Sequence, residues 1–285
     1  MDETAGDNMR AGSFTLSASP RILAFDSGIG GLSIVAALRR HLPHAHIDYL
    51  ADTAFFPYGG QDDDILKRHI VSLLENAILR LAPDVVVIAC NTASTLALAA
   101  LREICGVPFV GCVPPIRWAA RITRSKVIGL LATPATVRRA YITDLRNHYA
   151  PDCTVIAYGA RDLAALAESA FRGVPPDATC IRQDVAGLFE QPSGSRIDAV
   201  ALGCTHYTFV ADALRAASPP DVAWLDPADA VARQTRHVLE TTGLSTGVRS
   251  EPEHIWFTAP PYNPARLENG LKKLRYDQPE LWAST

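Results

Sequence analysis

The sequence predicts an α/β protein with two pseudo-symmetric domains, each a mostly parallel sheet flanked by helices, and a functional cleft between the domains. Two observations predict this fold class. Short β-rich runs alternate with longer helical segments along the chain, a pattern typical of parallel sheets with helices on both faces. Two segments that lie far apart in the chain also match each other, which indicates an internal duplication.

The elements expected in the first half of the chain alternate regularly between strand and helix. They are strand 21–25, helix 31–42, strand 46–51, helix 64–82, strand 84–89, helix 94–105 and strand 107–111. The series continues with helix 116–122, strand 126–132, helix 136–149, strand 154–158, a helical stretch over 162–190 and strand 198–203.

The expected domain organisation follows from these elements. Pro175, Pro176 and the run at 191–195 mark loops, because neither stretch is long enough for a linker. We expect a flexible N-terminal tail at 1–20, a first domain formed by 21–115 and about 226–285, and a second domain formed by 116–225.

Composition excludes several classes of protein. The chain has 285 residues, 48% of them apolar and 20% charged, with a net charge of -3, which is typical of a globular protein that is not a dedicated nucleic-acid binder. No apolar stretch is long enough to cross a bilayer, and the first twenty residues lack the apolar core of a signal peptide. The six widely spaced cysteines are therefore expected to be reduced, in the cytoplasm.

The duplication places two cysteines in equivalent positions. DVVVIACNTA at 84–93 and DAVALGCTHY at 198–207 each begin with aspartate, run through an apolar strand and reach a cysteine six residues later. RILAFDSGIGG at 21–31 and KVIGLLATPAT at 126–136 also correspond, as strand, small polar turn and helix. If the two halves face each other, Cys90 and Cys204 point into one cleft.

Several chemistries could use a pair of thiols. A disulfide is disfavoured in a reducing compartment, and the Cys-x-x-Cys spacing of a redox pair is absent. Zinc usually needs four ligands, but only Cys204 and His206 lie close in sequence. A cysteine hydrolase would leave one thiol without a role. Inversion of a carbon centre does use both thiols. One thiolate removes a proton from one face of the carbon while the other thiol delivers a proton to the opposite face.

Five motifs, taken in order, resemble those of glutamate racemases, members of the aspartate/glutamate racemase superfamily. They are Asp26-Ser27-Gly28-x-Gly30-Gly31, Pro57-Tyr58-Gly59, Cys90-Asn91-Thr92-Ala93-Ser94, Thr133-x-x-Thr136 and Gly203-Cys204-Thr205-His206-Tyr207. The resemblance runs from about residue 20 to the C-terminus. It implies a cofactor-independent enzyme without a metal, which interconverts L- and D-glutamate and supplies D-glutamate for peptidoglycan synthesis.

The resemblance also implies roles for individual residues. Cys90 would act on D-glutamate with help from Asp26, and Cys204 on L-glutamate with help from His206. The implied substrate-binding set also contains neutral donors and a tight turn, namely Ser27, Pro57, Tyr58, Gly59, Asn91, Thr92, Thr133, Thr136 and Thr205. Asp52 and Glu168 stand where the family carries further acidic residues, whereas Cys105, Cys112, Cys153 and Cys180 match no motif and are expected to be packing residues.

Alternatives and partners complete the expectations. A racemase of aspartate or a hydantoin would share the two-thiol chemistry, and a DNA gyrase inhibitor would need neither thiol. A dinucleotide-binding protein is disfavoured because Ser33 occupies the third glycine position of the fingerprint. Candidate partners implied by the resemblance are a muropeptide-nucleotide effector and a second copy of the chain. The chain departs from the family at Pro115 and Thr208, both beside the expected site.

Overall fold

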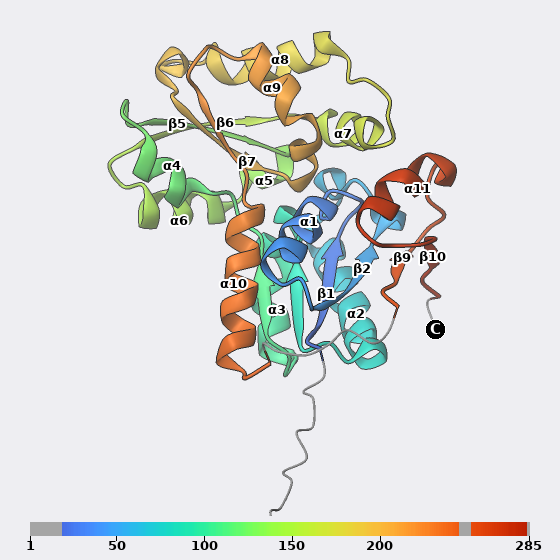
Figure 1. Ribbon diagram of the computed structural model, residues 1–285. Coiled ribbons are helices and arrows are strands. Elements are labelled where there is room, and N and C mark those ends of the chain that lie inside the picture. Colours follow the sequence, from blue (N-terminus) through green and yellow to red (C-terminus); the bar gives the residue numbers. More distant parts are fainter. Residues whose placement is uncertain (1–18, 245–251, 284–285) are drawn as a thin grey trace, which may run out of the picture.

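The fold consists of two separate parallel sheets with helices on both faces of each (Figure 1). The computed structural model describes residues 19–244 and 252–283, so nearly all of the predicted tail lies outside the described residues. Every strand pairing in the described residues is parallel, from β1 with β2 to β7 with β8. The predicted fold class is therefore confirmed.

The first sheet has the strand order β10-β9-β2-β1-β3-β4. Its strands are β1 (Arg21–Asp26), β2 (His46–Ala51), β3 (Val85–Ile88), β4 (Phe109–Gly111), β9 (Ile255–Phe257) and β10 (Glu280–Leu281). One face packs against α1 (Leu32–His41), α10 (Ala228–Thr241) and α11 (Pro264–Lys273), and the other against α2 (Asp63–Leu81) and α3 (Asn91–Ile104). Successive β1 residues enter these two cores in turn, which explains why the strand is apolar throughout.

The second sheet has the order β6-β5-β7-β8. Its strands are β5 (Val127–Ala132), β6 (Thr154–Gly159), β7 (Ala199–Gly203) and β8 (Ala223–Leu225). Helices α7 (Leu163–Phe171), α8 (Ala178–Phe189) and α9 (Ala211–Ala217) cover one face, and α4 (Ile116–Ile122) and α6 (Ala140–Tyr149) cover the other. The remaining helical segments are α5 (Pro134–Arg138), η1 (Thr53–Phe55), η2 (Tyr58–Gly60), η3 (Gly194–Arg196) and η4 (Thr205–Val210).

Two predicted helices are interrupted. The helix expected over 136–149 is divided into α5 and α6, because Arg139 has an extended backbone between them. The stretch expected over 162–190 is divided into α7 and α8, since Gly173 is left-handed with φ of 81° and two prolines follow it. Proline cannot continue a helix, and glycine tolerates positive φ.

The C-terminal part of the chain returns to the first sheet. After β8, helix α10 leads back, and β9 then pairs with β2. The domain boundaries at 115 and about 226 stay a prediction, which is consistent with this distribution of strands. Within the described residues, no helix combines the length and apolar character needed to cross a membrane.

This topology brings four strand ends together. Asp26 is the last residue of β1, and Cys90 follows β3. In the second sheet, Thr133 follows β5 and Cys204 follows β7. The carboxyl ends of parallel strands are the usual position of a ligand site in α/β folds, and here each sheet contributes two of them.

Candidate active site

Both predicted thiols line the same small cavity between the two sheets. Cys90 is 6% exposed and immediately precedes α3, and Cys204 is 7% exposed and immediately precedes η4. The cavity volume is about 20 Å³, which is room for about one water molecule. In this conformation the cavity is therefore too small for an amino acid.

Most of the predicted substrate-binding residues line this cavity. They are Ser27, Pro57, Tyr58, Gly59, Cys90, Asn91, Thr92, Thr133, Cys204, Thr205 and His206. Asp26, Asp52, Thr136 and Glu168 are buried behind the lining. The sequence did not single out Phe56 and Ala164, which also line it.

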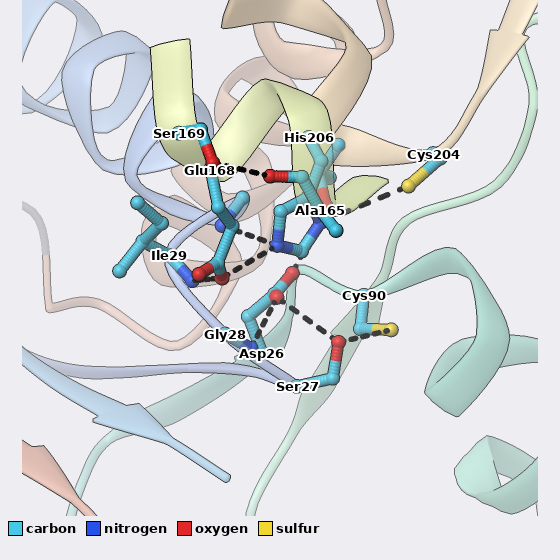
Figure 2. Close-up of polar contacts among 12 residues, drawn as sticks. Asp26, Ser27, Gly28, Ile29, Cys90, Ala165, Glu168, Ser169, Cys204 and His206 are labelled. Atoms are coloured by element: carbon cyan, nitrogen blue, oxygen red, sulfur yellow. Dashed lines mark hydrogen bonds and ion pairs between the residues drawn. The ribbon is translucent and has the colours of Figure 1, made fainter. Parts of the chain in front are cut away.

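A chain of hydrogen bonds leads from Cys90 to a buried carboxylate (Figure 2). The Cys90 thiol donates to Ser27 Oγ over 3.7 Å, and that hydroxyl donates to Asp26 Oδ1 over 3.4 Å. Burial, together with the charge of Asp26, raises the pKa of Cys90 to about 12. Burial also raises the pKa of Asp26, although the neighbouring His206 opposes this shift. The Cys90 thiol is therefore protonated at neutral pH in this state.

Cys204 is the start of a second chain of contacts. Its Sγ atom lies 3.7 Å from His206 Nδ1, and His206 Nε2 lies 3.2 Å from Glu168 Oε1 (Figure 2). Burial by itself would lower the pKa of His206, but the hydrogen bonds to Cys204 and Glu168 raise it well above its ordinary value. Burial would raise the pKa of Glu168, whereas the hydrogen bond and charge of His206, with the charge of Arg172, lower it to about 2. These directions favour an ionised Glu168 beside an imidazolium.

The protonation state of His206 selects the partner of Nε2. The backbone N–H of Gly30 also points at Nε2, over 3.2 Å. An imidazolium donates from Nε2 to Glu168, and the contact with Gly30 is then unfavourable. A neutral ring protonated at Nδ1 accepts from Gly30 instead and donates towards Cys204. The ring can thus change its charge without leaving its place.

Contacts between the two halves connect the surroundings of the two thiols. Thr205 Oγ1 donates to Asp26 Oδ2 over 3.0 Å, and the Ile29 N–H donates to Glu168 Oε1 over 3.1 Å. A Cβ atom on Gly28 would meet Glu168 at 2.3 Å, and one on Gly30 would meet the His206 ring at 2.4 Å. These two glycines therefore permit close approach of the other half, which is a different role from cradling a dinucleotide.

Polar side chains at the N-termini of α3 and α5 line the cavity. Thr133 is the N-cap of α5 and its hydroxyl accepts from the Thr136 N–H over 3.3 Å. Thr136 Oγ1 lies 2.9 Å from Thr133 Oγ1 and 3.3 Å from Thr92 Oγ1, so it joins two lining residues. Asn91 donates from Nδ2 to Cys112 Sγ over 3.5 Å, while its buried Oδ1 has no hydrogen-bond partner among the described residues.

Asp52 organises the turn that carries the Pro-Tyr-Gly motif. Its Oδ2 atom accepts from Tyr58 over 2.5 Å and lies 2.7 Å from His69 Nε2, while Oδ1 accepts from Thr258 over 2.8 Å. Asp52 is fully buried and acts on the cavity through Tyr58. The sequence offered no signal for His69 or Thr258, because neither lies near Asp52 along the chain.

The other cysteines differ in their surroundings. All six cysteines lie in the described residues and are free thiols. Cys112 is buried beside Asn91, and Cys105 and Cys153 are partly buried. Cys180 is exposed, so the expectation that it is a packing residue was wrong. Over residues 19–244 and 252–283, no group of three or more His, Cys, Asp or Glu side chains is arranged to hold a metal ion.

The fold and the site define a class: a two-sheet α/β protein with a buried thiol pair on one cavity between its sheets. The sequence model of the Asp/Glu/hydantoin racemase family matches residues 32–235. A glutamate racemase of Granulibacter bethesdensis is 52% identical over 231 residues, covering 81% of this chain and 83% of the relative. One of Brucella canis is 43% identical over 268 residues, covering 92% and 97%.

A solved structure agrees with these relatives. Escherichia coli glutamate racemase, in complex with L-glutamate and the activator UDP-MurNAc-Ala, superposes with a TM-score of 0.85 at 31% identity, covering 93% of this chain and 98% of the other. The chain belongs to the glutamate racemases of the Asp/Glu/hydantoin racemase family, and these enzymes are isomerases.

Proposed function

We propose that this chain interconverts L- and D-glutamate without a cofactor, with Cys90 and Cys204 as the two acid/base groups. The observation that carries the proposal is the pair of buried thiols, supplied by equivalent strand ends of two sheets and lining one cavity. A titratable group on each side of a carbon allows a proton to be removed from one face while another is delivered to the opposite face.

In the direction from L- to D-glutamate, the Cys204 thiolate removes the Cα proton and becomes a thiol. The electron pair of the C–H bond stays on the substrate as a carbanion, which is delocalised into the α-carboxylate. The Cys90 thiol then donates its proton to the opposite face and becomes a thiolate. The reverse reaction exchanges the two roles, so both thiols take part in each direction and no proton is gained or lost overall.

The resting protonation pattern favours the L enantiomer as the first substrate. Cys90 keeps its proton because burial and the charge of Asp26 raise its pKa. His206 lies beside Cys204 and has a raised pKa, so a positive charge on the ring favours proton removal by Cys204. After one turnover to D-glutamate the pattern is reversed, and proton exchange with solvent restores it.

Donors around the cavity stabilise the carbanion. The Cα proton of an amino acid is far less acidic than a thiol, so the developing negative charge needs preorganised partners and little water. The N-terminus of α3 begins at Asn91, directly after Cys90, and Thr92, Thr133 and Thr205 add hydroxyl groups. Backbone N–H groups at a helix N-terminus are suited to a carboxylate. Because the cavity is small, the two halves must separate to admit glutamate.

The decisive experiment replaces each thiol by a hydroxyl. We measure the rate of racemisation by circular dichroism. We expect Cys90→Ser and Cys204→Ser each to lower this rate by about 1,000-fold or more, because each direction loses an acid or a base. Cys105→Ser is the matched control and should retain wild-type turnover, since Cys105 does not line the cavity. Activity in either active-site variant near that of the control would refute the two-thiol mechanism, and a need for added pyridoxal phosphate or metal would refute cofactor independence.

The same proposal includes a choice of substrate. Aspartate and hydantoins are processed within the wider family, but the curated relatives named above are glutamate racemases. We expect kcat/KM for glutamate to exceed that for aspartate by at least about 100-fold, because a missing methylene leaves the side-chain carboxylate away from its donors. Equal kcat/KM values for glutamate and aspartate would contradict a preference for glutamate and would leave only the assignment to the Asp/Glu/hydantoin racemase family.

The physiological role in the proposal is supply of D-glutamate for peptidoglycan, and the candidate effector is a muropeptide nucleotide. Support comes from the Escherichia coli enzyme, whose structure contains UDP-MurNAc-Ala as activator. We expect this compound to raise kcat/KM of the wild-type chain, measured with D-glutamate at fixed enzyme concentration. Unchanged kinetics at millimolar concentrations would separate this chain from activator-dependent relatives without affecting the assignment of the thiols.

A further inference from the structure

Arg172, at the C-terminal end of α7, lies behind the Cys204 side of the cavity. Its Nη1 atom donates to Glu168 Oε2 over 2.9 Å and to the Glu168 carbonyl oxygen over 3.0 Å. Its Nε atom donates to the carbonyl oxygen of Tyr262 over 3.3 Å. The side chain is only 9% exposed although it is charged, and it does not line the cavity.

We propose that Arg172 is a positioning residue that holds the Glu168 carboxylate against His206 and so maintains the His206–Cys204 pair for proton transfer. This inference rests on the proposed two-thiol function. It assigns Arg172 to the Cys204 side of the reaction, since its contacts within the described part of the chain lead to Glu168 and Tyr262 and not to Cys90.

The two carboxylate oxygens of Glu168 make separate contacts. Oε1 accepts from the Ile29 N–H and contacts His206 Nε2. Among the described residues, Arg172 is the hydrogen-bond donor to Oε2. A carboxylate held at one oxygen only can rotate about its terminal torsion, which is broad. Loss of the Arg172 contact would thus let Oε1 move away from the ring.

Arg172 itself is anchored from the other half of the molecule. Tyr262 lies just before α11, whose sequence neighbours β9 and β10 belong to the first sheet. Helix α11 approaches α7 closely, because a Cβ atom on Gly270 would meet the Phe171 ring at 2.5 Å. Phe171 also packs against Phe209 of η4, with ring centroids 4.8 Å apart. The position of the guanidinium therefore depends on closure of the two halves.

Charge supports the same assignment. Among the described residues, the charged or titratable groups that interact with Glu168 include His206, Arg172, Asp26 and the buried Tyr49. Arg172 is a fixed cation, because guanidinium does not deprotonate in proteins. It balances Glu168 when His206 becomes neutral during the proton-transfer cycle, so the carboxylate stays ionised throughout.

The test compares Arg172→Gln and Arg172→Lys with Arg215→Gln in the full chain. Arg215 is a matched control, since it forms an exposed ion pair with Asp212 three residues away on its own helix. We expect Arg172→Gln to lower kcat on the order of 10- to 100-fold with little change in KM, because a misplaced group costs rate rather than binding. Arg172→Lys should retain an intermediate rate, and Arg215→Gln should match the wild type.

Isotope effects distinguish positioning from a purely structural role. With Cα-deuterated L-glutamate, whose C–D bond is broken by Cys204, the primary isotope effect should rise in Arg172→Gln; with Cα-deuterated D-glutamate it should fall. Glu168→Gln should show the same pattern, and adding Arg172→Gln to it should cost little further rate. If Arg172→Gln does not fold, Arg172→Lys is measured in the same way.

Three results would overturn the inference. Unchanged kcat in a folded Arg172→Gln, equal isotope shifts for both enantiomers, or additive losses in the double variant would each reduce Arg172 to a structural residue. Failure of the proposed function looks different, because it would appear as full activity in Cys90→Ser or Cys204→Ser.

Discussion

At the scale of single residues, Asp26 is where the surroundings of the two thiols meet. One of its oxygens leads through Ser27 to Cys90, and the other accepts from Thr205, the residue after Cys204. Its carboxylate also interacts electrostatically with His206. Asp26 and His206 therefore interact with each other. Asp26 is connected to the Cys90 thiol through Ser27, and His206 contacts the Cys204 thiol.

Substitution of the two assisting residues should damage different proton transfers. We expect Asp26→Asn to make the Cys90 step more limiting, with a larger primary isotope effect on Cα-deuterated D-glutamate. His206→Asn should make the Cys204 step more limiting and enlarge the effect on the L enantiomer. Turnover must fall in both directions in each variant, because no enzyme changes the equilibrium ratio. Identical shifts for both enantiomers in the two variants would refute the side-specific roles.

At the scale of elements, the turn between β1 and α1 binds two carboxylates and packs closely against the other half. Its Gly28 and Ile29 N–H groups bind the carboxylates of Asp26 and Glu168. The absence of side chains at Gly28 and Gly30 allows Glu168 and His206 to come this close. A short turn of small residues thus connects the two sheets.

Gly30→Ala tests this close approach. The new Cβ would overlap the His206 ring at 2.4 Å, so the ring must move away from Cys204. We expect a loss of racemisation on the order of 100-fold and a loss of about 1–3 kcal/mol in the free energy of unfolding. Gly106→Ala is the control, since a Cβ there meets no atom within 4 Å. Wild-type activity in Gly30→Ala would show that the ring position is not critical.

At the scale of the whole molecule, charged residues from one half are buried against the other. Arg139, between α5 and α6, donates to Asp63 Oδ1 over 2.7 Å and to Thr95 Oγ1 over 3.2 Å. Glu168 and Arg172 make the corresponding contacts on the other side of the cavity. Closure of the two halves is therefore linked to charge, and its stability should depend on pH.

Glu168 should contribute to stability above acid pH. Its folded-state pKa of about 2 lies below the ordinary value of 4.5, so its contribution is fully present above about pH 4.5 and is lost as pH falls towards 2. The contribution is on the order of 3 kcal/mol. In urea titrations between pH 6 and 3, the wild-type free energy of unfolding should therefore decline more steeply than that of Glu168→Gln. Parallel profiles would contradict the lowered pKa.

The sequence alone was enough to predict the alternation of strands and helices, the equivalent positions of Cys90 and Cys204, and the family. These features depend on local apolar patterns and on residue identities at short spacing. Both can be recognised in the sequence without knowledge of the fold. The split at Arg139 was missed, because the residues on either side favour helix and the break depends on one backbone conformation. The helical stretch expected over 162–190 was too long, although Pro175 and Pro176 within it were recognised as a loop signal.

The tertiary structure decided the contacts between residues that lie far apart in the chain. It alone shows that Thr258 donates to Asp52 behind the cavity, that Thr205 reaches Asp26, and that Arg172 joins Glu168 to Tyr262. The return of β9 to pair with β2 belongs to the same group. Such pairings are set by how strands join within a sheet and how the two sheets pack together, and local spacing carries no information about a neighbour supplied by another part of the chain.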